Sequence, residues 1–349
     1  MITIDGIIFN SRNRPGGVNV YFRELIRRAA QVEQIQVIVY DTSIKPSDLQ
    51  IEPEQFELRP ERLLERYRSL SNVLDGLLHS SYYRTSRQPR ILNLITVYDF
   101  TYEKFTAGIR TSVHTWQKLD AIMRSDAVIC ISHNTKRDLQ KYVPEYPEEK
   151  IFITHLAASE HFKPVASTTT TLTTQPFVLF VGARAGYKNF FTAVEAVRLI
   201  DDIALVCVGG GTFTPQEHAL LDGALLGRYF HAGSVRTAQL NEFYNCAVCL
   251  IYPSLYEGFG IPLLEAMQAG CPFIALNRSS IPEVAGEAGI LIDKPNPQIF
   301  AAAINECRNA ARRQQIRALG FEQARSFSWN KTFNETLSIY HQLLGRTLA

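Results

Sequence analysis

Short apolar runs alternate along this chain with segments in which apolar residues recur every three or four positions. The runs predict strands at residues 2–9, 36–40, 90–97, 127–131, 177–181, 203–208, 249–252 and 272–276. The periodic segments predict helices at residues 18–30, 189–200 and 331–344, and a further helix from about Asn134 with Ser132 as its N-cap. In the first helix we expect Val20, Leu25 and Ile26 to face the core. Such alternation is typical of mostly parallel sheets enclosed by helices.

A threonine-rich segment between prolines, residues 163–176, interrupts this alternation, which then restarts. Because it has little to bury, we interpret it as an exposed linker between two doubly wound α/β domains, although a surface loop within one domain could have the same composition. The predicted bounds are residues 1–165 for the first domain, 166–176 for the linker and 177–328 for the second domain, with residues 329–349 packing back on the first. Ligands of such sheets bind beyond the carboxyl ends of the strands, which favours a site in a cleft between the domains.

Composition and charge exclude several classes of protein. Hydrophobic residues make up 46% and charged residues 20%, as in an ordinary globular protein, and the net charge of +2 supplies no basic surface for nucleic acid. The six cysteines lie mostly in apolar runs, and Cys246 and Cys249 lack the second ligand pair that zinc needs. The N-terminus lacks the pattern of a signal peptide, and no run reaches the roughly 20 apolar residues of a membrane span. We expect a cytoplasmic protein with free thiols and no metal.

The segment EGFGIPLLE places Glu257 and Glu265 on either side of a glycine-rich turn. Pro262 favours the start of a helix, and Gly258 and Gly260 allow the backbone to approach a ligand closely. A helix N-terminus carries about half a positive charge and binds anions, so a diphosphate fits this turn. The two carboxylates would then accept hydrogen bonds from hydroxyl groups, Glu265 from a ribose and Glu257 from a sugar ring.

A second glycine-containing loop, VGARAGYKN at residues 181–189, also follows a strand and opens a helix. Arg184 offers a planar fork and Lys188 a point charge, and both suit phosphate. Taken alone, a lysine at a helix start is most often just solvated. Together with EGFGIPLLE in the same domain, the loop indicates a diphosphate site.

At this point the residues resemble a family. EGFGIPLLEAMQAGCPFIA and the later SSIPEVAGEAGILID are similar to the donor-binding signature of the retaining GT-B glycosyltransferases, family four, including its E-x7-E spacing. GARAGYKN resembles the phosphate loop of that family, and RPGGVNVYFRELI, TVYDFTYEKF and ICISHNTKRDL resemble segments of its first domain. The resemblance covers nearly the whole chain and is densest in residues 177–293.

The resemblance implies a GT-B fold of two Rossmann-like domains and a transferase in polysaccharide biosynthesis. It implies transfer of a hexose, with retention, from a nucleotide sugar (UDP-glucose first, GDP-mannose next) to a polysaccharide or lipid-linked saccharide on the side of the first domain. The implied catalytic residues are Glu257, Lys188, Arg184 and Asp99, and the implied donor-binding residues are Gly16, Gly17, Gly258, Phe259, Gly260, Ile261, Glu265 and Val235. Because cations and a helix start would hold the diphosphate, we expect neither a metal nor a further cofactor.

Two positions depart from the family pattern. Tyr98 stands where the family usually has histidine, and the arginine falls at Arg184 rather than directly after Gly182, with Tyr187 where many members have a second arginine. An inactive nucleotide-sugar-binding scaffold subunit and a GT-B sugar-nucleotide epimerase therefore remain as alternatives. An oxidoreductase is disfavoured because GxGxxG is absent.

Arginines cluster in the first domain. Residues 61–90 carry Arg62, Arg66, Arg68, Arg84, Arg87 and Arg90. One interpretation is a solvated helix face; the other is a basic rim that meets anionic lipid head groups or a lipid-diphosphate acceptor at the inner face of the membrane.

Overall fold

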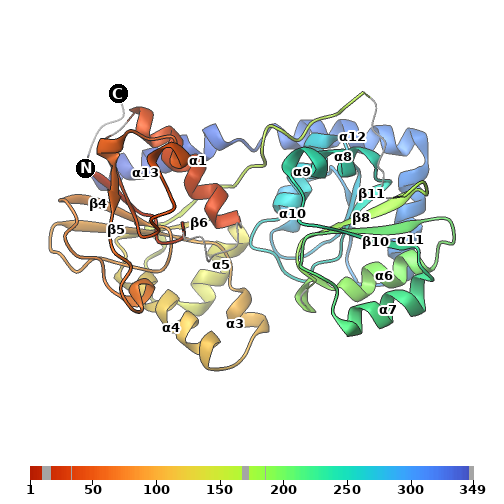
Figure 1. The fold of residues 1–349 in the computed structure, drawn as a ribbon, viewed down its shortest axis with the longest axis horizontal. Coiled ribbons are helices and arrows are strands. Elements are labelled where there is room, and N and C mark those ends of the chain that lie inside the picture. Colours follow the sequence, from red (N-terminus) through yellow and green to blue (C-terminus); the bar gives the residue numbers. More distant parts are fainter. Residues whose placement is uncertain (10–16, 33, 167–172, 185, 346–349) are drawn as a thin grey trace. The chain divides into compact units, whose positions relative to one another are not determined.

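The computed structural model describes residues 1–9, 17–32, 34–166, 173–184 and 186–345, and it divides into two compact units. One unit consists of Met1–Leu156 with Ser328–Ala349, and the other of Ala157–Phe327 (Figure 1). The first unit thus ends before residue 165, where the sequence pattern placed its boundary. Residues 167–172 of the expected linker lie outside the described part of the chain.

The first unit is built on a parallel sheet with the strand order β3-β2-β1-β4-β5-β6-β7. The strands are β1 (Ile2–Asp5), β2 (Ile35–Val39), β3 (Phe56–Leu58), β4 (Gly76–Ser80), β5 (Ile91–Val97), β6 (Ala127–Cys130) and β7 (Ile151–Ile153). The helices are α1 (Gly17–Val32), α2 (Pro46–Leu49), α3 (Thr101–Phe105), α4 (Ile109–Arg124), α5 (His133–Tyr142) and α13 (Trp329–Leu343), with 3-10 turns at Pro53–Gln55, Glu65–Tyr67 and Glu148–Lys150. Helices α1 and α13 lie on one face of the sheet, and α3, α4 and α5 on the other (Figure 1).

Helix α13 belongs to the first unit and adds to its core. It packs beside α1, and the Tyr340 hydroxyl lies 2.7 Å from Nδ1 of His79 on β4. Nε2 of His79 is in turn 2.8 Å from the Thr96 hydroxyl on β5. Burial lowers the pKa of His79 to about 3, so this histidine is a neutral member of the core.

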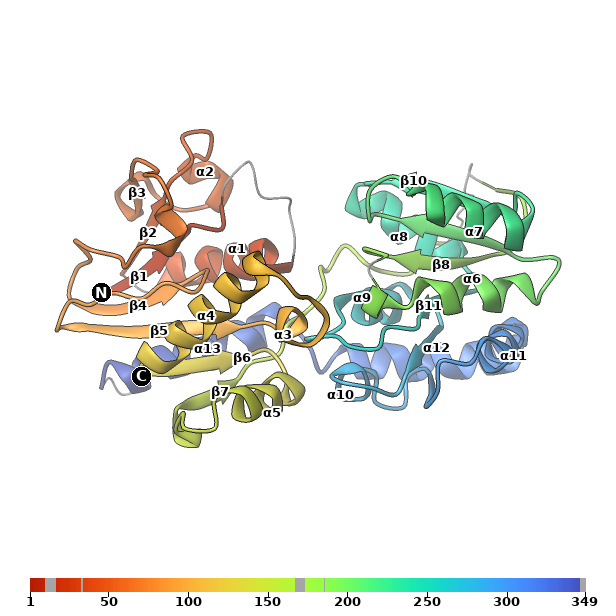
Figure 2. The same cartoon turned by 90° about the horizontal axis from the view of Figure 1, so that it is seen from below.

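The second unit has a parallel sheet with the order β10-β9-β8-β11-β12-β13. Its strands are β8 (Phe177–Val181), β9 (Ala204–Val208), β10 (Tyr229–Gly233), β11 (Cys249–Tyr252), β12 (Phe273–Leu276) and β13 (Ile290–Ile292). Its helices are α6 (Phe190–Arg198), α7 (Pro215–Leu225), α8 (Thr237–Cys246), α9 (Ile261–Ala269), α10 (Ile281–Ala285), α11 (Pro297–Arg308) and α12 (Ala310–Ala324), with a 3-10 turn at Gly186–Lys188. Helices cover both faces of each sheet (Figure 2), which confirms two doubly wound α/β domains.

Local differences from the predicted elements have physical reasons. The first strand ends at Asp5, not residue 9, because the chain turns at Gly6, where a Cβ would lie 2.8 Å from the Ile38 carbonyl oxygen. Leu25 and Ile26 are buried as predicted, but Val20 is 43% exposed, so its assignment to the core was wrong. The Ser132 hydroxyl accepts the Thr135 N–H at 3.0 Å and caps α5 as predicted.

All six cysteines lie in the described part of the chain and are free thiols, five of them buried. Among the described residues, none of the helices combines the length and apolar character that crossing a bilayer demands.

Candidate functional site

The candidate site of the second unit lies where the direction of strand order reverses. The chain passes from β8 through β9 to β10 on one side, then returns to β11 and continues to β13 on the other side. Neighbouring strands β8 and β11 thus send their following loops in opposite directions, which opens a crevice at their carboxyl ends. Both predicted segments, VGARAGYKN at residues 181–189 and EGFGIPLLE at residues 257–265, follow these two ends.

Two interactions join these loops. The Leu255 N–H donates to the Tyr187 carbonyl oxygen at 2.8 Å. Lys188 Nζ donates to both carboxylate oxygens of Glu257, at 2.7 and 2.8 Å. The two side chains are only 15 and 10% exposed, so the ion pair is shielded from solvent. The structure therefore brings together Lys188 and Glu257, two of the four predicted catalytic residues.

The loop before α9 is held in shape by two serines that the sequence analysis did not single out. The Ser279 hydroxyl accepts the Glu257 N–H at 2.9 Å, and the Ser280 hydroxyl donates to the carbonyl oxygens of Glu257 and Phe259 at 2.9 and 2.8 Å. Gly260 has φ of +112°, which only glycine adopts readily. The motif SSIPEV was the available signal, because two hydroxyl side chains precede a proline that suits the start of a helix.

Helix α9 starts at this loop and presents its N-terminus at the site. Ile261 is its first residue and Pro262 its second, so the helix begins one residue before the start that Pro262 suggested. Phe259 is 3% exposed and stacks edge-on with Phe327 at 5.8 Å, so its side chain belongs to the core. The turn can therefore bind an anion through backbone N–H groups at the positive end of the helix dipole.

Glu265 lies farther along α9 than the first turn where it was expected. Its Oε2 accepts a hydrogen bond from the Tyr244 hydroxyl at 2.8 Å. The residue keeps part of its surface exposed, yet burial of its carboxyl group raises the pKa of Glu265 to about 7, although the bond from Tyr244 acts in the opposite direction. Tyr244 was not identified from sequence.

Replacing Glu265 with glutamine is expected to reduce the pH dependence of stability. Between roughly pH 4.5 and 7 the folded chain holds a proton on Glu265 that the unfolded chain has lost, so the contribution of this residue to stability falls as pH rises through that window. Because the residue is partly exposed, we expect a change of about 1 to 2 kcal/mol. Urea denaturation of both proteins at about pH 5 and about pH 8 measures their free energies of unfolding. A change between the two pH values that is the same for both proteins would contradict the prediction.

Arg184 bonds groups other than the Lys188–Glu257 pair, and its predicted role at the diphosphate stays a prediction. Its Nε donates to Glu217 at 2.7 Å, and its terminal nitrogens donate to the carbonyl oxygens of residues 209–212 at 2.9 to 3.3 Å. The side chain is 3% exposed. With its N–H groups engaged in this way, Arg184 holds the turn after β9 in place.

The remaining predicted donor-binding residues fall in several places. Val235 is half-buried in the loop between β10 and α8, at the same carboxyl edge of the sheet as Lys188. Gly17 is the exposed first residue of α1 in the first unit, and Gly16 lies outside the described residues.

Asp99 follows β5 in the first unit. Its carboxylate accepts the Thr101 N–H at 2.8 Å and so stabilises the start of α3. The preceding Tyr98, which replaces the family's histidine, has its hydroxyl buried and packs edge-on against Tyr21 at 5.9 Å. Tyr98 is therefore part of the local packing, and the predicted role of Asp99 toward a sugar stays a prediction.

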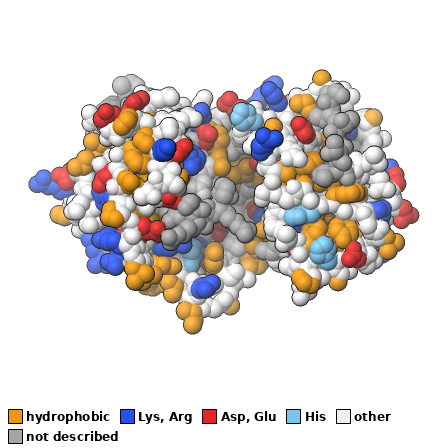
Figure 3. Space-filling view, in the orientation of Figure 1, with side chains coloured by type: hydrophobic (Ala, Val, Ile, Leu, Met, Phe, Trp, Pro, Cys, Tyr) orange, Lys and Arg blue, Asp and Glu red, His pale blue; other side chains and the backbone are white. Residues whose placement is uncertain are grey.

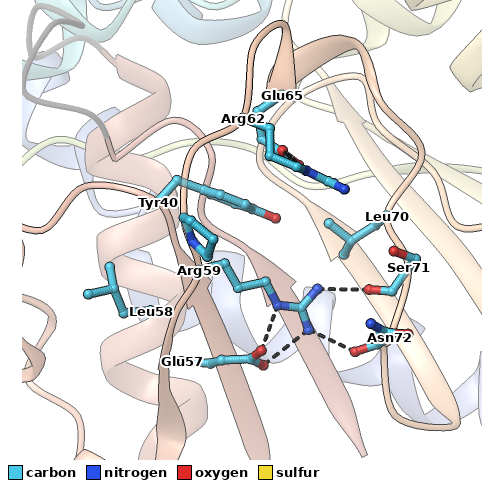
Figure 4. Close-up of a pocket in the computed structure, with 10 residues that line it drawn as sticks. Tyr40, Glu57, Leu58, Arg59, Arg62, Glu65, Leu70, Ser71 and Asn72 are labelled. Carbon is cyan, nitrogen blue, oxygen red and sulfur yellow. Dashed lines mark hydrogen bonds and ion pairs between the residues drawn. The ribbon is translucent and has the colours of Figure 1, made fainter.

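A pocket of about 390 Å³ lies beyond β2 and β3 in the first unit (Figure 4). Its arginines are already paired: Arg59 with Glu57 at 2.6 Å and Arg62 with Glu65 at 2.7 Å. Beside it, Arg84 is wholly buried and bonds Glu65 at 2.8 Å and Asp5 at 3.1 Å. The expectation that Arg84 lies on an exposed basic rim was therefore wrong, and the charges around this pocket largely cancel.

A comparison with known protein families matches one part of the chain. Residues 167–318 match the family described as Glycosyl transferases group 1, and this match covers most of the second unit. This part of the chain is therefore similar to the glycosyltransferases of that group, in agreement with the resemblance seen in the motifs.

Particular relatives sharpen this result. The chain is 30% identical over 214 residues to the O-antigen chain mannosyltransferase B of Escherichia coli, an alignment that covers 57% of this chain and 56% of that protein. It thus spans little more than half of that relative. It is also 25% identical over 258 residues to the alpha-maltose-1-phosphate synthase of Mycolicibacterium smegmatis, over 66% of this chain and 67% of that one.

Solved structures share the fold along nearly the whole chain. A sucrose-phosphate synthase from Thermosynechococcus elongatus has a TM-score of 0.77 at 21% identity, covering 99% of both chains. Anabaena HepE in complex with UDP and glucose has a TM-score of 0.77 at 13% identity, covering 98% of this chain and 99% of that one.

Proposed function

We propose that this chain is a retaining glycosyltransferase of family four that moves a hexose from a nucleoside-diphosphate sugar to a saccharide acceptor. The observation that carries this proposal is the shielded Lys188–Glu257 pair at the adjoining ends of β8 and β11, beside the N-terminus of α9. A cation, a carboxylate and the N-terminal end of a helix at one switch point match a ligand that combines a diphosphate with sugar hydroxyls.

The proposed chemistry uses each of these groups. Cleavage of the anomeric carbon–oxygen bond leaves negative charge on the departing diphosphate, and fixed positive groups stabilise that charge as it develops. Lys188 and the start of α9 supply them. Without donor, Lys188 and Glu257 neutralise each other; with donor, we propose that the ammonium group turns to the phosphate while the carboxylate accepts hydroxyl groups of the transferred sugar.

The donor and acceptor are also proposals. UDP-glucose remains the first candidate, supported by the complex of the structural relative HepE with UDP and glucose, and GDP-mannose the second, supported by the mannosyltransferase relative. For the acceptor we propose a growing polysaccharide or its lipid-linked precursor.

Thermal-shift titration with UDP and GDP, followed by measurement of nucleotide release from UDP-glucose and GDP-mannose, tests the proposed function. One nucleotide is expected to raise the melting temperature, because a ligand that binds only the folded state stabilises it. Its sugar derivative is then expected to release nucleotide in the presence of a saccharide acceptor. Binding without release would instead favour the inactive scaffold subunit.

Removing divalent metal is expected to leave transfer within about twofold of its starting rate, because Lys188 and the helix N-terminus take the place of a metal at the diphosphate. Nucleotide release is measured before and after EDTA treatment. A loss that added Mg²⁺ restores would contradict this proposal.

A further inference from the structure

Helix α4 of the first unit turns an apolar stripe toward solvent. Ile109, Val113, Trp116 and Met123 are 86, 41, 64 and 49% exposed. Their spacing along the helix places these four side chains on one face. A helix that served only to cover the sheet would turn such a stripe inward.

The opposite face of α4 carries polar groups that are buried and bonded. Gln117 Nε2 donates to the carbonyl oxygens of Arg66 and Tyr83 at 2.6 and 3.0 Å. Lys118, which is fully buried, donates to Glu103 at 2.8 Å and to the Asp99 carbonyl oxygen at 2.9 Å. These bonds fix the orientation of α4, so its apolar stripe stays exposed to solvent in the folded unit.

A second apolar group lies beside this stripe. Leu63, Leu64 and Tyr67 are 83, 62 and 43% exposed, and the bond from Gln117 to Arg66 ties their turn to α4. On α3, Tyr102 is 44% exposed and stacks on His114 of α4 at 4.2 Å. We call these side chains together the docking face: Leu63, Leu64, Tyr67, Tyr102, Ile109, Val113, Trp116 and Met123.

Cations accompany the docking face. Arg66, Arg68 and Arg110 are exposed, and within the described part of the chain none of their side chains has a carboxylate partner. The Arg66 guanidinium lies over the Tyr82 ring at 4.2 Å. In Figure 3, hydrophobic side chains gather beside Lys and Arg side chains at the lower left, over the region of α4.

From this combination we infer that the docking face seats the protein on the surface of an anionic lipid bilayer. Protruding leucine, isoleucine and tryptophan side chains insert among head groups and upper acyl chains, and the unpaired arginines attract acidic lipid. The basic rim was one of two interpretations of the sequence, and its Arg66 and Arg68 accompany the docking face. Its Arg62, Arg84 and Arg90 instead pair with carboxylates.

The charge of this face distinguishes a lipid surface from a second copy of the chain. Two copies meeting through it would bring Arg66, Arg68 and Arg110 of each protomer together, and like charges in a desolvated contact oppose association. An acidic bilayer instead complements all three.

Flotation with lipid vesicles tests the inference. The wild-type chain is expected to float with vesicles of phosphatidylcholine and phosphatidylglycerol, less at high salt, and to stay behind with phosphatidylcholine alone. Ile109→Asn and Trp116→Ala are each expected to lower the partition coefficient about tenfold, and Arg110→Gln about fivefold.

The matched control is Leu226→Asn, which removes an 85% exposed side chain from the second unit, compared with 86% for Ile109. It should float as the wild type does. No flotation of the wild type, or equal flotation of all the variants, would overturn the inference. So would a dimer in light scattering that Ile109→Asn dissociates, because that result assigns the face to a second copy. Turnover of a water-soluble acceptor by the Ile109→Asn variant reports separately on the proposed glycosyl transfer.

Discussion

Lys188→Ala is expected to lower the rate of glycosyl transfer by roughly a hundred- to a thousandfold, because it removes a positive charge placed where the departing diphosphate becomes negative. Its ammonium group bonds both oxygens of Glu257 at 2.7 and 2.8 Å, so the two side chains already lie together at the site before substrate arrives. Glu257→Ala is expected to abolish transfer as well. The measurement is nucleotide release under saturating donor, together with the melting temperature.

The control for this prediction is Arg198→Ala. Arg198 pairs with Glu195 at 2.9 Å in the same unit, on α6, and is 47% exposed. This variant should keep full activity, because exposed pairs contribute little. A folded Lys188→Ala protein with near wild-type turnover would exclude Lys188 from the chemistry and remove the main support for the proposed function.

Arg84→Met is expected to destabilise the first unit by about 3 to 5 kcal/mol, because it leaves two buried carboxylates without their common cation. The Arg84, Asp5 and Glu65 side chains are 0, 0 and 2% exposed. Burial already raises the pKa of Asp5 despite the nearby guanidinium. Without Arg84 the two acids should take up protons more readily, so the defect should shrink as pH falls.

Calorimetry measures this effect as a lower melting temperature of the transition that belongs to the first unit. Arg90→Met provides the comparison, because Arg90 and Asp75 form a pair that is 81 and 63% exposed. That change should cost no more than about 0.5 kcal/mol. Equal stabilities of the two variants would show that the buried triad contributes nothing beyond a surface pair.

Much of the second unit could be predicted because its strands are continuous apolar runs that end at glycine or proline. The bounds of β8 and β11 agree with the sequence to the residue. Helix α4 and strand β4 are among the elements that were missed. Part of α4 departs from the usual pattern, with Gln117 and Lys118 buried and Trp116 exposed. Hydrophobic periodicity cannot reveal an orientation that depends on hydrogen bonds to distant segments.

Some residues of the candidate site could likewise be predicted from the sequence, and others could not. Lys188 and Glu257 were found because each lies in the loop that follows a strand, and adjacent parallel strands bring such loops together. The partner of Arg184 could not be anticipated. Glu217 also caps the start of α7, where it bonds the Thr214 N–H at 2.7 Å, and only the packing of α7 brings it to Arg184.

The return of α13 to the first unit has a consequence for biosynthesis. Residues 157–327 are contiguous and can complete their own core as soon as they leave the ribosome. The first unit, although synthesised earlier, lacks Tyr340 beside His79 until residues 329–343 have been translated. The half that emerges first is therefore the half that matures last, and a nascent chain stalled before residue 328 would expose the unfinished face to chaperones.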